Sequence, residues 1–227
     1  MPRRVRYDDR VQRITAITPL AQDPKRATVK VDGRRVATLS VNMIGDIKLV
    51  VDQPWDDTLA ARVAEAGQYD KAMRAAMQRI NRRPLSRAEL CGKLRQLGFA
   101  SAVMKRVVDR LSELSLINDV TLGRSLIDEI QRRKPAGPRL LRQKLLQRRL
   151  DRVMVDQIVG HECAQRDASA DALRLVQSRL WAMNSLDEHT RRRRLWGMLA
   201  RRGFDTDTID AALSAVGADG VVGDAPW

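Results

Sequence analysis

Three aspartates near the C-terminus are the first residues of this 227-residue sequence that could do chemistry. Asp205, Asp207 and Asp210 stand in LARRGFDTDTIDAAL, residues 199–213, shortly after Arg201 and Arg202. Carboxylates gathered in this way suit a hard metal ion, and arginines suit phosphate. Aspartate is also a common first residue of a helix, where it caps free backbone amides. The stretch is therefore open to three interpretations: a metal site, a nucleic-acid contact, or a turn between two helices.

Other groups that often carry chemistry lack the context they need. His161, Glu162 and Cys163 are adjacent, so on a helix they point in different directions, and no second ligand pair has a suitable spacing. A glycine run at 217, 220 and 223 has no strand before it and no helix after it, so it does not match a dinucleotide-binding turn. The sequence predicts no catalytic centre, no metal and no cofactor, and hence a protein that is not an enzyme.

Positive charge is the dominant feature of the composition. Lys and Arg total 42 against 28 Asp and Glu, a formal charge of +14, and the excess is concentrated between residues 70 and 166. Arginine supplies most of it, and its planar guanidinium suits phosphate and carboxylate groups. A GC-rich genome explains the preference for arginine over lysine equally well. An excess of this size nevertheless indicates an anionic partner.

The cations recur in short runs, which suggests a continuous basic surface. Two runs stand just before the second helix of a predicted three-helix unit and one stands at that helix. We predict contact with a partner or with DNA by these residues: Lys30, Arg34, Arg35, Arg82, Arg83, Arg132, Arg133, Lys134, Arg191, Arg192, Arg193, Arg194, Arg201 and Arg202. Aromatic residues are scarce near the runs, although Trp181 and Trp196 flank the last one, so backbone phosphate or an acidic protein surface is favoured over base stacking.

The elements that position these cations divide the chain into a small β unit and a helical remainder. RATVKVDGRRVATLS alternates on both sides of Asp32-Gly33, the dipeptide preferred in two-residue hairpin turns. In that register Lys30 faces Arg35, and Val29 faces Val36 on the core side. RITAIT, from Arg13, is a further predicted strand, and MIGDIKLVV fits either a strand or a short helix. The unit is expected to span residues 1–57.

From about residue 58 the same helical pattern occurs three times. Leucines at 90 and 94 followed by Phe99 correspond to residues 141, 145 and 150, and then to residues 195, 199 and 204. The apolar spacing predicts helices, with Leu97 in the first stripe, and Gly98 and Gly203 at helix corners. A mainly α fold is expected, an elongated and curved tandem array of three three-helix repeats at 58–118, 119–166 and 167–216, with a flexible tail at 217–227. The points taken to match the aspartate cluster in the other repeats hold Ser101 and Asp151, both capping residue types, which favours helix caps over metal ligands for the aspartates.

Four motifs in order give the chain a family resemblance. RPLSRAELCGKLRQLGF, VVDRLSELSLINDVTLGRSLI, RRKPAGPRLLRQKL and RLWGMLARRGFDTDTIDAAL resemble the successive motifs of the RecX family, regulators of the RecA recombinase, and the likeness covers roughly residues 12–215. The sequence departs from the family pattern at Leu122-Gly123, where an aromatic residue and alanine are usual. It departs again at Arg148-Arg149, which replaces a Lys-Gly pair.

The resemblance implies a modulator of RecA that has no catalytic centre. Such a protein binds RecA and RecA–DNA filaments and limits filament extension, ATP turnover, strand exchange and coprotease activity, with direct DNA binding as a further implication. Two alternatives remain open from the residues: a stand-alone DNA-binding repeat protein, and a scaffold for RNA. With no apolar leader, no stretch of 18 apolar residues and two distant cysteines, we expect a cytoplasmic monomer without a membrane partner.

Overall fold

The computed structural model describes residues 11–219 and is mainly helical, with one small antiparallel sheet. The chain forms two compact units. The first unit contains residues up to Arg83 together with Leu90–Leu114, and the second contains Pro84–Glu89 together with the residues from Ser115 onward. The expected mainly α fold, with three-helix repeats after an N-terminal β unit, is confirmed.

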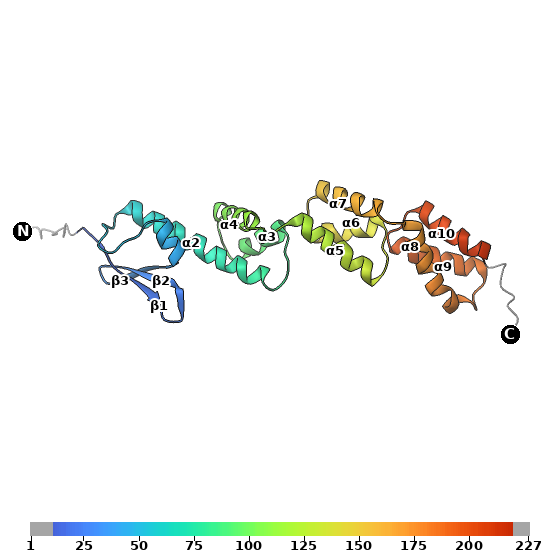
Figure 1. The fold of residues 1–227 in the computed structure, drawn as a ribbon, viewed down its shortest axis with the longest axis horizontal. Coiled ribbons are helices and arrows are strands. Elements are labelled where there is room, and N and C mark those ends of the chain that lie inside the picture. Colours follow the sequence, from blue (N-terminus) through green and yellow to red (C-terminus); the bar gives the residue numbers. More distant parts are fainter. Residues whose placement is uncertain (1–10, 220–227) are drawn as a thin grey trace, which may run out of the picture. The chain divides into compact units, whose positions relative to one another are not determined.

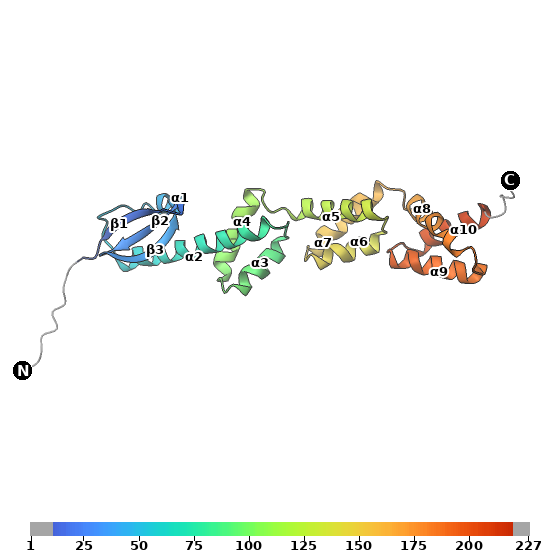
Figure 2. The same cartoon turned by 90° about the horizontal axis from the view of Figure 1, so that it is seen from below.

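The first unit opens with three antiparallel strands in the order of the chain: β1 (Ile14–Leu20), β2 (Asp23–Val31) and β3 (Arg34–Ser40). The turn between β2 and β3 has positive φ at both Asp32 (47°) and Gly33 (78°), which is the backbone that an Asp-Gly hairpin turn provides. The predicted hairpin and the strand expected from Arg13 are confirmed. Figure 2 shows the sheet beside α1 and α2.

The hairpin register agrees with the prediction near the turn and departs from it one residue later. Lys30 pairs with Arg35, but Val29 pairs with Ala37 because a β-bulge inserts Val36 into β3. The predicted core position of Val36 is wrong: the bulge moves it out of alternation and leaves it 43% exposed. Ala37 instead packs against the core.

Two helices complete the β unit. The segment MIGDIKLVV, for which the sequence allowed either a strand or a short helix, begins inside a short helix, α1 (Val41–Asp46). The Ser40 hydroxyl caps the first turn of this helix. Helix α2 (Asp57–Ile80) is capped by Asp56, whose carboxylate accepts a hydrogen bond from the Leu59 amide at 2.7 Å. The sheet and the first half of α2 then share one core, centred on Ile14, Val29 and Leu39, which are fully buried.

The first unit also contains α3 (Arg87–Gln96) from Leu90 onward and the whole of α4 (Ser101–Glu113), which packs on α2. Leu90 and Leu94 are fully buried as predicted. Leu97 is 49% exposed, so its predicted place in the core stripe is wrong. It lies just beyond the end of α3, where Gly98 at φ 81° turns the chain away from the helix direction.

The second unit contains two three-helix groups, seen in yellow-green to orange and in orange to red in Figure 1. The first group is α5 (Asp119–Arg133), α6 (Pro138–Gln147) and α7 (Arg152–Ala164); the second is α8 (Ala168–Leu180), α9 (Glu188–Arg201) and α10 (Thr206–Asp219), with a short 3-10 turn, η1, at Trp181–Met183. Each group has its own core, built around Leu141 and Leu145 in one and around Leu195 and Leu199 in the other. Helix α10 continues through residues 217–219, where the tail was expected to begin, and residues 220–227 of the expected tail lie outside the described residues.

Candidate partner-binding surface

The predicted contact residues of the β unit lie on the hairpin. Lys30 is opposite Arg35 across the two strands, and Arg34 follows the turn directly. All three side chains are exposed. Like charges opposed across a strand pair destabilise it by some tenths of a kcal/mol. The opposed pair therefore presents two positive charges on one face of the sheet, where an anionic surface would relieve their repulsion.

Two basic runs occupy matching points after the first helix of a three-helix group. Arg82 and Arg83 follow the end of α2 and precede α3, and both are exposed. Arg132 and Arg133 form the last turn of α5, and Lys134 is its C-cap. This placement neutralises the negative end of the helix dipole as well as exposing charge. Arg133 is also held by Glu129 one turn earlier, at 2.7 Å.

The third run lies within a helix rather than before it. Arg191 to Arg194 occupy the first half of α9, directly before buried Leu195. Arg192, Arg193 and Arg194 are exposed, whereas Arg191 is half-buried because it lies one turn before Leu195 on the core side. Arg192 lies 3.9 Å from Asp210 of α10.

The last two predicted contact residues differ sharply from each other. Arg201 is exposed at the end of α9. Arg202 is turned inward: its Nε donates to the Pro135 carbonyl at 2.8 Å, and its Nη2 contacts the carbonyls of Lys134 and Pro135. Burial lowers the pKa of the Arg202 guanidinium, which still remains charged at neutral pH. The surroundings of Arg202 are thus those of a packing residue.

Sequence reasoning missed this inward arginine and its equivalent 54 positions earlier, Arg148. Arg148 donates through Nη2 to the Pro84 carbonyl at 2.8 Å and through Nε to Glu89 at 3.0 Å. Both arginines are the third residue after a buried leucine of the repeat, and both bind the segment that enters a second helix. The repeat offset, applied to polar as well as apolar positions, would have paired them.

The main chain reinforces the Arg202 contact. The Gly137 amide donates to the Arg202 carbonyl at 2.9 Å, and the Arg139 amide donates to the Gly203 carbonyl at 3.1 Å. Gly137 and Gly203 are both buried, so the backbone of the α9–α10 corner packs directly on the start of α6. We call these residues the α6–α9 joint: Lys134, Pro135, Gly137, Arg139, Arg202 and Gly203.

Replacing Arg202 by alanine should destabilise the second unit by about 1–3 kcal/mol, because the partly buried carbonyl of Pro135 loses its charged donor. The matched change Arg201→Ala removes the same charge from an exposed position and should alter stability by no more than about 0.5 kcal/mol. Urea unfolding of both variants measures the difference. Equal stabilities would show that the joint contributes nothing through this arginine.

The aspartates of the opening motif divide into a cap and two helix residues. Asp205 accepts a hydrogen bond from the Thr208 amide at 2.8 Å, as a residue preceding α10 should, so the predicted cap is confirmed. Asp207 and Asp210 are exposed within α10 and do not precede it, so the cap predicted for these two is wrong. The bond from Thr208 holds the pKa of Asp205 below its usual range. Asp187 caps α9 in the same way, through the Thr190 amide at 2.9 Å, and its pKa is lowered for the same reason.

This cap makes part of the stability depend on pH. Because the pKa of Asp205 is lower in the folded chain than in the unfolded chain, its contribution is present above the unfolded value of about 3.9 and is lost as pH falls through the folded value. Asp205→Asn keeps an acceptor that does not titrate, so this variant should lose less stability between pH 5 and pH 2 than the parent chain, on the order of 0.5–1 kcal/mol. Thermal unfolding across this range checks it. Parallel curves for the two proteins would contradict the assignment.

The three adjacent residues that the sequence offered as possible metal ligands do not come together as a metal site. Glu162 pairs with Arg124 at 3.4 Å, His161 lies 3.0 Å from the Gln165 amide, and Cys163 packs against the core of α5–α7. Among residues 11–219, no three His, Cys, Asp or Glu side chains gather in a way that could hold a metal ion. In the same part of the chain, no helix is both long and apolar enough to span a bilayer.

This chain is similar to known proteins in both sequence and fold. Two family profiles match it: the first three-helix domain of RecX at residues 72–111 and the third at residues 167–213. A regulatory protein RecX from Chlorobium phaeobacteroides is 30% identical over 146 residues, which are 64% of this chain and 93% of that protein. The chain belongs to the RecX family. The RecX of Thermobifida fusca is 33% identical over 137 residues, 60% of this chain and 73% of the relative.

Solved RecX structures agree with this fold. A crystal structure of regulatory protein RecX superimposes with a TM-score of 0.75 at 17% identity, covering 88% of this chain and 97% of the other. RecX from Lactobacillus salivarius gives a TM-score of 0.60 at 18% identity and covers 66% of this chain and 97% of its own. The family is one of regulatory proteins, and the two matched three-helix domains contain Arg82 and Arg83 and the Arg191–Arg194 run.

Proposed function

We propose that this chain binds the RecA recombinase and RecA–DNA filaments and inhibits filament extension, with the ATPase, strand exchange and coprotease activities that depend on the filament. Membership of the RecX family supports this role. The observation that carries it is the recurrence of exposed arginine runs in successive three-helix groups, after α2, at the end of α5 and within α9. Repeated weak contacts to a repeating anionic partner add to give high avidity.

The contact residues proposed here are those of the exposed runs and the hairpin. Arg202 is the least suitable of the predicted contact residues, because its guanidinium is committed to the carbonyls of the α6–α9 joint. Binding through exposed cations should weaken steeply as the salt concentration rises.

Hydrolysis of ATP by RecA on single-stranded DNA, titrated with this protein, tests the proposal. The rate should fall as the protein is added, and half-inhibition should require more protein at higher salt. Binding to bare DNA and to RecA-coated DNA is then compared at physiological salt. Equal or better binding to bare DNA would overturn the filament proposal.

Direct binding of single-stranded DNA is a second candidate function. Trp181 is 86% exposed and Trp196 is 41% exposed, and they flank the Arg191–Arg194 run. Exposed aromatic rings beside cations suit base stacking combined with phosphate contact. If this function holds, Trp181→Ala should weaken binding to single strands while leaving binding to duplex DNA unchanged.

A further inference from the structure

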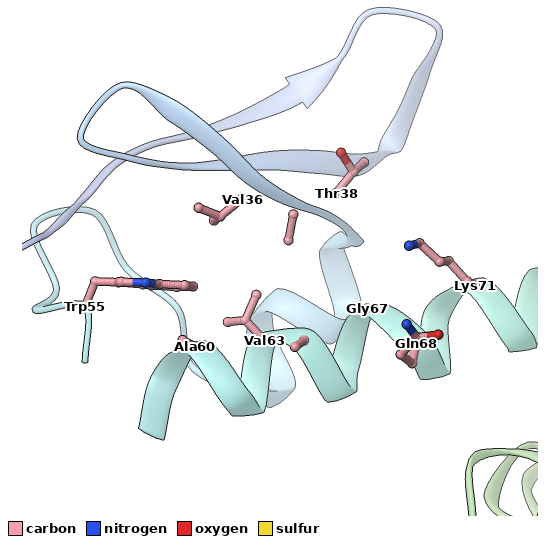
Figure 3. Close-up of a pocket in the computed structure, with 10 residues that line it drawn as sticks. Val36, Thr38, Trp55, Ala60, Val63, Gly67, Gln68 and Lys71 are labelled. Atoms are coloured by element: carbon pink, nitrogen blue, oxygen red, sulfur yellow. The ribbon is translucent and has the colours of Figure 1, made fainter. Parts of the chain in front are cut away.

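A groove in the first unit lies between strand β3 and helix α2, and none of the residues that line it belongs to the arginine runs of the three-helix groups. Its volume is about 270 Å³, and Val36 to Thr38 form one wall. Figure 3 shows Trp55 and Val36 at one end and Lys71 with Gln68 at the other, with α2 running below the strand. The groove therefore has an apolar end and a polar, cationic end.

Small residues on α2 create this space. Ala60, Ala64 and Gly67 line the groove at intervals of four and three residues, which places them on one face of the helix. A side chain larger than a methyl group at these positions would fill it. Ala64 is itself exposed, so the gap is open to solvent and is not part of the core.

The opposite wall is a sheet edge. Within the described residues, β3 is paired with β2 along one side and with no strand along the other. A free edge offers main-chain donors and acceptors to an added strand. The bulge at Val36 also keeps that side chain at the groove, 43% exposed, where an apolar residue of a ligand could cover it.

One ion pair ties the two walls together. The Arg26 guanidinium donates to the Thr38 carbonyl at 2.9 Å and to the Asp70 carboxylate at 2.8 Å, which joins the end of β3 to α2. Arg26 and Asp70 are nearly buried, with side chains 12% and 8% exposed. The separation of strand and helix is thus set by the fold before any ligand arrives.

The charge of the lining indicates which ligand fits. Lys71 is the only charged residue that lines the groove, and it forms no ion pair or hydrogen bond with the residues the structure describes. From Ala60 to Lys71 the helix rises roughly 16 Å, the length of about five residues of extended chain. An extended segment that fills this length places alternate side chains on one face, so an apolar residue at one end and a carboxylate at the other stand four positions apart.

We propose that the groove between β3 and α2 binds an extended segment of a partner protein that adds to β3 as a fourth strand. The segment carries an apolar residue against Trp55 and Val36, and an aspartate or glutamate four positions away at Lys71. Main-chain pairing with β3 supplies affinity, and the two side-chain positions supply specificity. This binding does not depend on the function proposed above.

Selection from a displayed library of nine-residue peptides on the full-length chain tests the proposal. Enriched peptides should share an aliphatic or aromatic residue four positions from an acidic one. Calorimetry with a synthetic enriched peptide should then show at least tenfold weaker binding to Ala64→Leu, which fills the groove. Ala61→Leu is the matched control, because Ala61 is exposed on the same helix outside the groove, and its affinity should be unchanged. Enriched peptides that bind both variants equally would overturn the proposal.

Charge reversal at the polar end provides a second, independent measurement. Lys71→Glu should weaken binding of the acidic peptide about tenfold and restore binding of the same peptide with lysine in place of its acid. Lys25→Glu, on the exposed start of β2, changes the net charge equally and should have no effect. A loss of affinity in both variants would contradict the Lys71 contact. A dimer in solution that Ala64→Leu converts to a monomer would instead identify a second copy as the occupant and overturn the partner segment.

Discussion

Replacing Gly203 by alanine is expected to destabilise the second unit by about 3 kcal/mol. An alanine Cβ there would lie 2.7 Å from the Leu140 Cβ and closer still to the Leu140 backbone nitrogen, and backbone atoms cannot move aside as a flexible side chain can. The residue also has φ of 84°, a conformation that costs an L-amino acid about 1–2 kcal/mol. Both effects push the α9–α10 corner away from the start of α6.

Loss of the α6–α9 joint should change both the urea unfolding and the hydrogen exchange of the second unit. The hydrogen bonds from the Gly137 amide to Arg202 and from the Arg139 amide to Gly203 would break together. Urea unfolding should show a lower midpoint, and hydrogen exchange should accelerate in α8–α10 more than in α5–α7, because the last group would open on its own. Gly137→Ala should behave similarly, since its Cβ would lie 2.5 Å from the Phe204 nitrogen.

Gly160→Ala is the control for these changes. Gly160 lies in the interior of α7, and an added Cβ there has no neighbour within 4 Å. Alanine is a better helix former than glycine, so this variant should be more stable by roughly 0.5–1 kcal/mol. If Gly203→Ala unfolded at the same urea concentration as Gly160→Ala, the close packing of the joint would be refuted.

Replacing Arg191 to Arg194 with alanine is expected to raise the half-inhibitory concentration in the RecA assay about tenfold, with folding preserved. Ionic contacts of three exposed arginines and the half-buried Arg191, worth about 0.2–1 kcal/mol each, would sum to roughly 0.8–4 kcal/mol, a range that includes the 1.4 kcal/mol of a tenfold change. Folding should not suffer, because alanine has the highest helix propensity. The arginines also lie in the first half of α9, where positive charge is unfavourable to the helix dipole.

Net charge must be separated from position in this experiment. A second fourfold variant, Lys25, Arg95, Arg152 and Arg179 to alanine, removes the same charge from exposed positions outside the predicted contact residues. It should retain most of the inhibition, and circular dichroism should show both variants folded. The Arg191–Arg194 run would be excluded as a contact if the two variants inhibited equally well.

In the β unit, local sequence predicted the hairpin turn but not the bulge that follows it. Asp32-Gly33 set the turn because these two residues tolerate positive φ. The position of the turn then paired Lys30 with Arg35. The bulge at Val36 was not predictable from alternation, since a bulge conserves the strand pattern on both sides and shifts only the register between them. It depends on how β3 packs against the core rather than on Val36 itself.

At the candidate contact surface, Arg201 and Arg202 likewise separate what the sequence predicts from what the tertiary structure decides. The sequence presents two adjacent arginines that are chemically identical, and only the tertiary structure turns Arg202 onto the carbonyls of Lys134 and Pro135 while Arg201 stays exposed. Their environments differ because residues 67 and 68 positions away fold against one of them. A contact over that distance leaves no local pattern in the chain.

The sequence by itself determined the three-helix repeats, the hairpin turn, the caps and the concentration of positive charge, because each depends on residues within one or two helical turns of one another. The tertiary structure alone decided the exposure of Val36, the α6–α9 joint, and the groove between β3 and α2. These features arise where segments distant in the chain meet. There, burial and main-chain hydrogen bonding are set by the packing of whole elements, and a residue's type does not reveal its neighbours.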